Sequence, residues 1–499
     1  MVGRALPSLP QYRKDGVTRR LCASVHLDDD LAAEADRELT GDRLDAIGLT
    51  LGINFVALAR HARVAVRRRE ALDRQLAALG ALLVIALFAL LWGLTGGHAT
   101  VVQAGFYSLV GVLVISWWLV HHAESRARSA AQKVLHGQEK TEELAPPVEP
   151  EAEAWLNDLK RANVLPYADQ AALDKPFVGS GHIQLGKVVV WQPIDVSKPA
   201  AAPGGGTQSM VPFDAIDLHT YVAREMEKIS GLDGLRARNR LYVLGSHAYL
   251  LPDLVPDRTR RPRAQIPKPL VQAGLQRPGA AMRTHLCLER VSEGGRMVVS
   301  MYARAILNRP SLSWEVAVYA IPPLHGRFHV VDRLPVAPFA RWRSLVAYAT
   351  LRLWPELSGA PKRINERGRR RRRSARFLRK LRRDITKQHV IYDYGAPDSL
   401  RERYGDWDQA GHNELADAAD FLNRLQQGVL TATERFLKDH KIDTSSFDKA
   451  QQIITQTYNI NNVNGPSNIG HGGTINNPGG PQGSGPPGPQ GGGQPPARP

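Results

Sequence analysis

Cysteine is nearly absent from this chain, which has only Cys22 and Cys287 in 499 residues. Two thiols so far apart exclude a disulfide framework and a cysteine metal cluster, and they fit a reducing cytoplasm. Common catalytic motifs are also missing, since the chain contains no Gly-rich loop ending in Gly-Lys-Ser/Thr, no HExxH and no GxSxG. The sequence therefore points to no catalytic residue, cofactor or metal, and we do not expect an enzyme.

Charged residues and histidine are absent from two apolar runs, residues 76–94 and 101–120, which are separated by the six residues TGGHAT. At about 1.5 Å per residue, each run spans roughly 30 Å as a helix, the thickness of the hydrocarbon layer of a membrane. The sequence therefore predicts a transmembrane hairpin. Proton relays and ion pathways need ionisable groups, so a transporter or pump is disfavoured. A buried hairpin in a soluble domain and an oligomeric pore are the alternatives.

Basic residues flank the hairpin at both outer ends and are missing from its turn. Six arginines between positions 60 and 74 precede the first run, and Arg126, Arg128 and Lys133 follow the second. Lys and Arg close to a span stay on the cytoplasmic side. Richness in Arg, Ala, Gly and Pro is typical of bacteria with GC-rich genomes. We therefore expect a multi-pass protein of the bacterial inner (plasma) membrane with both termini cytoplasmic.

Composition divides the chain into seven segments. Pro and Gly mark the boundaries, because they end regular structure. The segments are an N-terminal cytoplasmic helical segment (1–75), the transmembrane hairpin (76–120), a polar helix and Pro/Glu linker (121–150), a cytoplasmic α+β domain (151–357), a polybasic amphipathic segment (358–390), a helical segment (391–458) and a disordered Asn/Gly/Pro-rich tail (459–499).

The central segment, residues 151–357, has the most globular composition. It begins with a helix-like stretch, EAWLNDLKRANVL, and contains three consecutive strand-like runs, MRTHLCLERV, RMVVSMYARAIL and SWEVAVYAI. Gly294 and Gly295 lie between the first two runs and supply the positive φ that a tight hairpin requires. The simplest prediction is an α+β fold in which helices pack on an antiparallel sheet.

A heptad pattern follows the basic segment, since Leu415, Leu422, Val429 and Phe436 recur every seven residues. This pattern suits either a short coiled coil or an amphipathic helix packed on its own domain. We favour the second interpretation because Gly428 interrupts a run of only three heptads.

Several smaller patterns have structural explanations. The acidic run at residues 28–30 precedes a helical stretch, so we expect it to cap a helix and not to bind a metal. GSGHIQLG, residues 179–186, has the wrong glycine spacing for a dinucleotide turn, and we interpret it as a loop. His182, His219 and His247 are single and scattered, so we expect structural roles for them. Ala89 and Gly93 suit close contact with a neighbouring helix.

Most of the net charge of +17 comes from one segment, because residues 362–387 carry a local charge of +12. Within RFLRKLRRDI the apolar side chains gather on one helical face, which is the pattern of an interfacial helix on an anionic leaflet. Lys and Arg near such a surface each contribute about 1 kcal/mol. The predicted membrane-surface residues are Arg369, Arg370, Arg371, Arg372, Arg373, Arg376, Phe377, Leu378, Arg379, Lys380, Leu381, Arg382 and Arg383.

Two other interpretations of this segment stay open. The uninterrupted arginines at 369–373 would neutralise nucleic-acid phosphates equally well, although no recognition module accompanies them. A solvated or protein-binding charge run is the third interpretation.

The Arg-flanked hairpin, the PFVGSG stretch at residues 176–181 and the strands ending in AVYAIPPL together resemble uncharacterised two-span membrane proteins of actinobacteria. The resemblance covers residues 17–350. It implies location and lineage, and it implies no catalytic residue, cofactor or substrate.

The sequence as a whole predicts an inner-membrane protein whose cytoplasmic α+β domain is a binding module. The expected partners are the lipid bilayer, its anionic headgroups and another protein; nucleic acid is less favoured, and a homo-oligomer is an alternative. Two other functions stay open: an oligomerising effector whose hairpins perturb the bilayer, and an enzyme whose site is assembled from residues distant in sequence.

Overall fold

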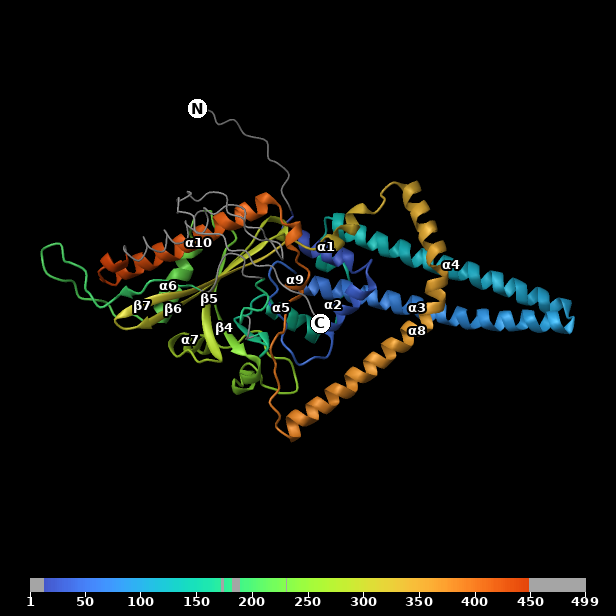
Figure 1. Ribbon diagram of the computed structural model, residues 1–499, viewed down its shortest axis with the longest axis horizontal. Coiled ribbons are helices and arrows are strands. Elements are labelled where there is room, and N and C mark those ends of the chain that lie inside the picture. Colours follow the sequence, from blue (N-terminus) through green and yellow to red (C-terminus); the bar gives the residue numbers. More distant parts are fainter. Residues whose placement is uncertain (1–12, 172–174, 182–188, 230, 448–499) are drawn as a thin grey trace, which may run out of the picture. The chain divides into compact units, whose positions relative to one another are not determined.

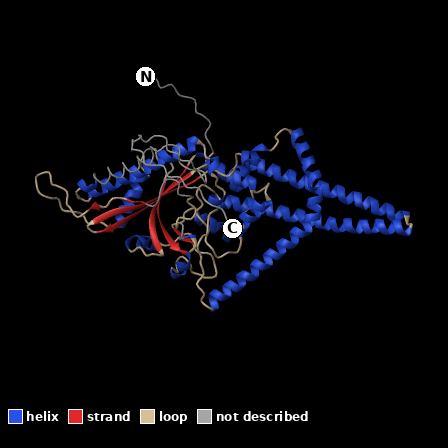
Figure 2. Cartoon of the chain, viewed as in Figure 1, coloured by secondary structure: helices blue, strands red, loops and turns tan. Residues whose placement is uncertain are grey.

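The computed structural model describes residues 13–171, 175–181, 189–229 and 231–447. The predicted disordered tail and His182 lie outside these residues. Within them the chain has the predicted α+β fold, in which long helices accompany one sheet (Figure 1; Figure 2). The α-helices are α1 Gly16–Ser24, α2 Asp29–Thr40, α3 Phe55–Gly96, α4 Ala99–His136, α5 Pro150–Leu159, α6 Ala215–Met226, α7 Lys268–Gln276, α8 Pro338–Lys387, α9 Leu400–Arg403 and α10 His412–Asp439.

The sheet has the strand order β1-β4-β5-β6-β7-β2, and β3 also pairs with β7. The predicted antiparallel meander is formed by β4, β5, β6 and β7, and Gly294 and Gly295 have the expected positive φ between β5 and β6. The strands are β1 Val164–Tyr167, β2 Val189–Val190, β3 Ile194–Asp195, β4 Arg236–Leu244, β5 Met282–Val291, β6 Val298–Asn308 and β7 Ser311–Ile321.

One strand differs from the prediction of a purely antiparallel sheet. The predicted helix EAWLNDLKRANVL ends at Leu159, and β1 pairs parallel with β4. Asn163 immediately precedes this strand and fixes its start, because its side-chain amide donates to the carbonyl of Ile266 and accepts from the Ile266 backbone N–H, at 2.8 and 2.9 Å. A short apolar run suits a helix end or a buried strand, and only these distant partners decide between them.

The two faces of the sheet have different covers. Helices α6, α7 and α10 pack on the face that includes Leu241 and Trp314. The opposite face is covered by Leu49 and Leu51 from the N-terminal segment, together with Phe177, in one buried cluster. The core of the α+β domain therefore includes residues that precede the hairpin in the sequence.

Helix α10 confirms the favoured interpretation of the heptad pattern. Leu422, Val429 and Phe436 are buried, and the helix packs on α6 and β6. Gly428 does not interrupt the helix; a Cβ there would meet the side chains of Met226 and Ile229, so glycine permits the close approach of α10 to α6.

Helices α3 and α4 form the predicted helical hairpin. Gly97 ends α3 in the left-handed conformation, with φ +70°. Gly93 lies close to α4, since a Cβ at that position would be 2.9 Å from the backbone nitrogen of Val102. Gly93 therefore permits the close approach of α4, the other arm of the hairpin. Both helices are longer than the apolar runs: α3 begins at Phe55 and α4 ends at His136. The part of α3 before its apolar run packs on α2.

Helix α8 contains residues 358–387 of the predicted polybasic segment (358–390), together with the twenty residues before it. It begins at Pro338, twenty residues before the predicted segment boundary, and it continues through Pro355 and Pro361 to Lys387. Internal proline removes a hydrogen bond and bends a helix, and Figure 1 shows α8 changing direction along its course. It packs on both α3 and α4.

The N-terminal acidic run caps a helix as expected. The side chain of Asp28 accepts hydrogen bonds from the backbone nitrogens of Asp30 and Leu31, both at 3.0 Å, at the start of α2. Residues 179–181 form part of a loop in which Gly179 and Gly181 have positive φ. The carboxylate of Glu402 accepts from the backbone nitrogens of both glycines, at 3.0 and 2.7 Å, and fixes this loop.

Candidate functional site

The two arms of the hairpin expose their apolar side chains. Both are long and apolar enough to cross a membrane, and only 22% and 17% of their most apolar windows is buried within the protein. A core hairpin of a soluble domain would be mostly buried. Large exposed side chains on these helices include Ile85, Phe88, Trp92, Tyr107 and Trp118. Such a continuous apolar surface indicates association with a membrane.

The basic half of α8, residues 362–387, is attached to α3 by a buried acid that the sequence did not single out. Asp73 is fully buried and accepts hydrogen bonds from Nε and Nη2 of Arg363, at 3.0 and 2.8 Å. Arg367 also donates to this carboxylate. Burial lowers the pKa of both arginines below the usual value for the side chain. The attachment places the start of the basic helix beside the part of α3 that precedes its apolar run.

A second acid, Glu356, extends this cluster. It accepts from Arg69 of α3 and from Arg363, the latter at 2.8 Å. Asp73 lies three residues before the first apolar run, in RRREALDRQL. Two acids inside a dense basic flank, Glu70 and Asp73, were the available sequence signal, but the partners of Asp73 in α8 lie in a distant segment.

The predicted membrane-surface residues divide into paired and free cations. Arg371 is bound to Glu70 of α3, and Arg382 is bound to Asp42 after α2. Arg383 lies 3.7 Å from the neighbouring Asp384. Within this predicted set, the exposed cations to which the described residues give no carboxylate partner are Arg369, Arg370, Arg372, Arg373, Arg376, Arg379 and Lys380.

The apolar residues of the same segment do not form one exposed stripe. Ile385 is buried, and Leu378 and Leu381 are half-buried, whereas Phe377 is 64% exposed. Arg382 near this end also donates to the carbonyl of Thr259 in the α+β domain. The C-terminal end of α8 therefore turns much of its apolar face to the protein, whereas its seven exposed cations without a carboxylate partner stay on the surface.

A groove of about 990 Å³ lies between α2, α3 and the basic half of α8. Its lining combines apolar side chains, among them Val66, Phe377 and Leu378, with acids and arginines in similar numbers. A surface with apolar contacts and charges of both signs suits a protein segment better than a nucleic acid, which needs an excess of cations.

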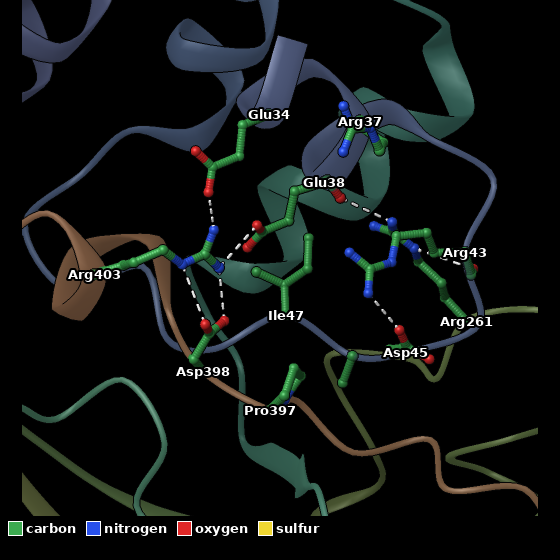
Figure 3. A pocket seen from close by; sticks show the side chains of 11 residues that line it. Glu34, Arg37, Glu38, Arg43, Asp45, Ile47, Arg261, Pro397, Asp398 and Arg403 are labelled. Carbon is green, nitrogen blue, oxygen red and sulfur yellow. Dashed lines mark hydrogen bonds and ion pairs between the residues drawn. The ribbon is translucent and has the colours of Figure 1, made fainter. Parts of the chain in front are cut away.

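A smaller polar pocket of about 300 Å³ lies between α2 and the segment before α9 (Figure 3). Arg403 lies on one side of it, where it pairs with Glu34, Glu38 and Asp398. On the opposite side Arg261 donates to the backbone carbonyl of Glu38 at 2.8 Å. The pairing of its charges gives this pocket a structural role, which is to hold α2 against α9.

The candidate histidines have structural partners. His219 is fully buried; its Nδ1 bonds to Asn239 Oδ1 at 3.1 Å, and its Nε2 accepts from the backbone nitrogen of Ala305 at 3.0 Å. His247 bonds to its neighbour Ser246. In the part of the chain that the structure describes, no group of three His, Cys, Asp or Glu side chains is placed to hold a metal ion.

A buried polar network lies on the sheet. Arg240 Nη1 is 2.6 Å from Glu289 Oε1, with Tyr242 and Cys287 beside the pair. Ser180 and Tyr302 share a hydrogen bond of 2.5 Å on the same face. These groups bond to each other and not toward a common point, so their arrangement favours a structural role.

Comparison with known proteins gives one match. The family model described as the AbeC-like domain matches residues 190–476. This span contains most of the sheet, the basic helix α8 and α10, and it leaves the hairpin outside. Neither the curated proteins nor the solved structures contain a match to this chain. Because the model covers more than half of the sequence, the chain belongs to the AbeC-like domain family.

Proposed function

We propose that this protein is a two-span inner-membrane protein whose cytoplasmic α+β domain binds a protein partner close to the membrane surface. One observation carries the proposal: exposed arginines without carboxylate partners lie on a helix that is bound directly to the base of an exposed apolar hairpin. The groove beside this helix supports a partner of mixed charge.

The arginines at 369–373 are close enough to reach anionic headgroups. Arg371 is bound to Glu70, six residues before the first apolar run, which is about 9 Å along a helix. The headgroup zone extends about 7 Å beyond the hydrocarbon on each side, and an arginine side chain spans the remainder. We limit the proposed lipid contact to Arg369, Arg370, Arg372 and Arg373, because Arg382, further along the helix, already contacts the α+β domain at Thr259.

Orientation is tested with a cysteine at Gly97, in the turn of the hairpin. Cys22 and Cys287 are both buried, so they give little background labelling. In intact spheroplasts Gly97→Cys should react with an impermeant thiol reagent, whereas Gly204→Cys, in an exposed loop of the α+β domain, should react only after lysis. The reverse pattern would contradict the orientation.

Lipid contact is tested with a fluorophore at Ser374→Cys in the full-length protein, reconstituted in nanodiscs. A headgroup nitroxide should quench this probe in anionic bilayers, and the quenching should fall as salt is raised. Replacing Arg369, Arg370, Arg372 and Arg373 with glutamine should remove it. If the same variant instead loses RNA or DNA binding while quenching is unchanged, the nucleic-acid interpretation replaces the lipid one.

A further inference from the structure

The first half of α8, residues 338–361, has an apolar face that no part of the described protein covers. Phe339 is 71% exposed, Trp342 57%, Leu351 78% and Trp354 63%. On the side of the helix opposite Leu351 and Trp354, Ala349 is buried on the hairpin. Ala349, Leu357 and Ala360 share a cluster there with Leu72, Leu76, Leu83, Val112 and Val120. This half-helix was part of the predicted α+β domain, and its composition alone suits a core helix.

Its contacts fix how deep it lies along the hairpin. The indole Nε1 of Trp117 donates to Thr350 Oγ1 at 3.1 Å, and Trp117 lies three residues inside the end of the second apolar run. Leu357 packs against Gly80, four residues inside the start of the first run. At 1.5 Å per residue these positions are about 5 Å inside the hydrocarbon boundary, which matches the depth of interfacial helices.

Both ends of this half-helix lie nearer the cytoplasm than its middle. Arg128 of α4 donates to Ser344 at 2.9 Å, eight residues beyond the second apolar run. At the other end Arg363 is held by Asp73, before the first run. Residues 350–357 of α8, which we call the crest, therefore lie at the depth of the apolar runs. After Pro355 and Pro361 the helix returns toward the cytoplasmic side.

The chemistry of this crest suits lipid. Residues 338–361 include Arg341, Arg343 and Arg352, and their one acid, Glu356, is buried and paired with Arg69 and Arg363. The hydroxyls of Thr350 and Ser358 donate to the helix carbonyls of Val346 and Trp354, at 2.9 and 2.7 Å, so neither requires water. Tryptophan beside exposed leucine is typical of the headgroup boundary.

We propose that residues 338–361 of α8 form a third membrane element, an interfacial helix that inserts Leu351 and Trp354 into the cytoplasmic leaflet. The occupant of the exposed face is the bilayer, because this face continues the exposed apolar surface of α3 and α4 at the same depth. The inference rests on the proposed membrane insertion of the hairpin. As a consequence, the basic half of α8 starts at the membrane surface, and insertion of the crest sets the direction in which this half leaves the membrane.

The test uses full-length protein in nanodiscs, with a single fluorophore at Leu351→Cys, at Arg352→Cys or at Val84→Cys, all exposed positions. A nitroxide carried high on the acyl chain should quench Leu351→Cys, and aqueous iodide should not. Arg352→Cys is the matched control, since it lies on the polar side of the same turn and should respond to iodide. Val84→Cys reports the span itself.

Each outcome has one meaning. Quenching by lipid at Val84→Cys and Leu351→Cys supports the inference. Quenching at Val84→Cys with iodide access at Leu351→Cys overturns the inference and leaves the span intact. No lipid quenching at Val84→Cys overturns the proposed membrane insertion. Protection of Leu351→Cys from both quenchers also overturns the inference and assigns this face to a second copy of the chain.

Discussion

The buried carboxylate of Asp73 and the guanidinium of Arg363 form a two-bond contact, at 3.0 and 2.8 Å, across 290 residues of sequence. The contact joins the base of the hairpin to the start of the basic helix. It therefore links the apolar anchor to the segment that carries most of the net charge.

Replacement of Asp73 tests how much this link contributes. Asp73→Asn should lower the free energy of unfolding by on the order of 2 kcal/mol, because Arg363 and Arg367 lose their buried counter-charge. The measurement is thermal unfolding of the detergent-solubilised protein. Glu70→Gln is the control, since its partner Arg371 is 71% exposed at the side chain, and exposed pairs contribute about 1 kcal/mol or less. Equal effects of the two variants would contradict the assigned role.

Two buried arginines should differ in how much stability is lost when each is removed. Arg240→Met should destabilise the protein by about 3–5 kcal/mol, because Glu289 would remain buried without its counter-charge. Arg401 is equally buried, but the acceptors of its side chain among the described residues are the carbonyls of Gly295 and Arg296, and burial lowers its pKa to about 10. Arg401→Met should therefore cost no more than about 1 kcal/mol. Denaturant unfolding of both variants in one detergent checks this ranking. A larger loss of unfolding free energy for Arg401→Met than for Arg240→Met would contradict it.

Stability should fall with acid through His219. Burial lowers the pKa of this side chain to about 4, and the unfolded chain titrates near 6.5. Between these values the unfolded state binds more protons, so stability is constant above about pH 6.5 and falls as the pH decreases toward 4. At about 1.4 kcal/mol per pKa unit the full loss is on the order of 3 kcal/mol.

The His219 prediction is measured by denaturant unfolding at several pH values. His219→Gln removes this titration, so the slope of stability against pH should be smaller in the variant than in the native protein. The stacked ring of Trp314, 5.3 Å away, gives a local fluorescence signal. An unchanged slope would show that other groups cause the acid sensitivity.

A glycine after the basic helix should tolerate no side chain. A Cβ at Gly395 would lie 2.1 Å from the carbonyl carbon of Tyr167, where the chain returns to β1 through the Tyr167–Ala396 bridge. Gly395→Ala must therefore move backbone and should lower the melting temperature clearly, with a cost on the order of 2 kcal/mol. Gly204→Ala has open space around it and should be neutral. Equal melting temperatures would contradict the close approach.

The sequence was most informative where structure is local. The hairpin, the meander β5–β6–β7, the cap at Asp28 and the amphipathic α10 follow from periodicity, turn residues and capping, which act between near neighbours. The charge of the basic segment was equally visible. What that charge contacts stays a proposal.

Only the tertiary structure decided how distant segments meet. The sequence does not show that Val164 begins a parallel strand, that Asp73 holds the basic helix, or that Leu351 and Trp354 lie on an uncovered face at the level of the hairpin. Each depends on partners more than seventy residues away. Local composition determined that the chain has an apolar hairpin, a sheet and a basic helix, and long-range contacts determined which face of that helix meets the protein.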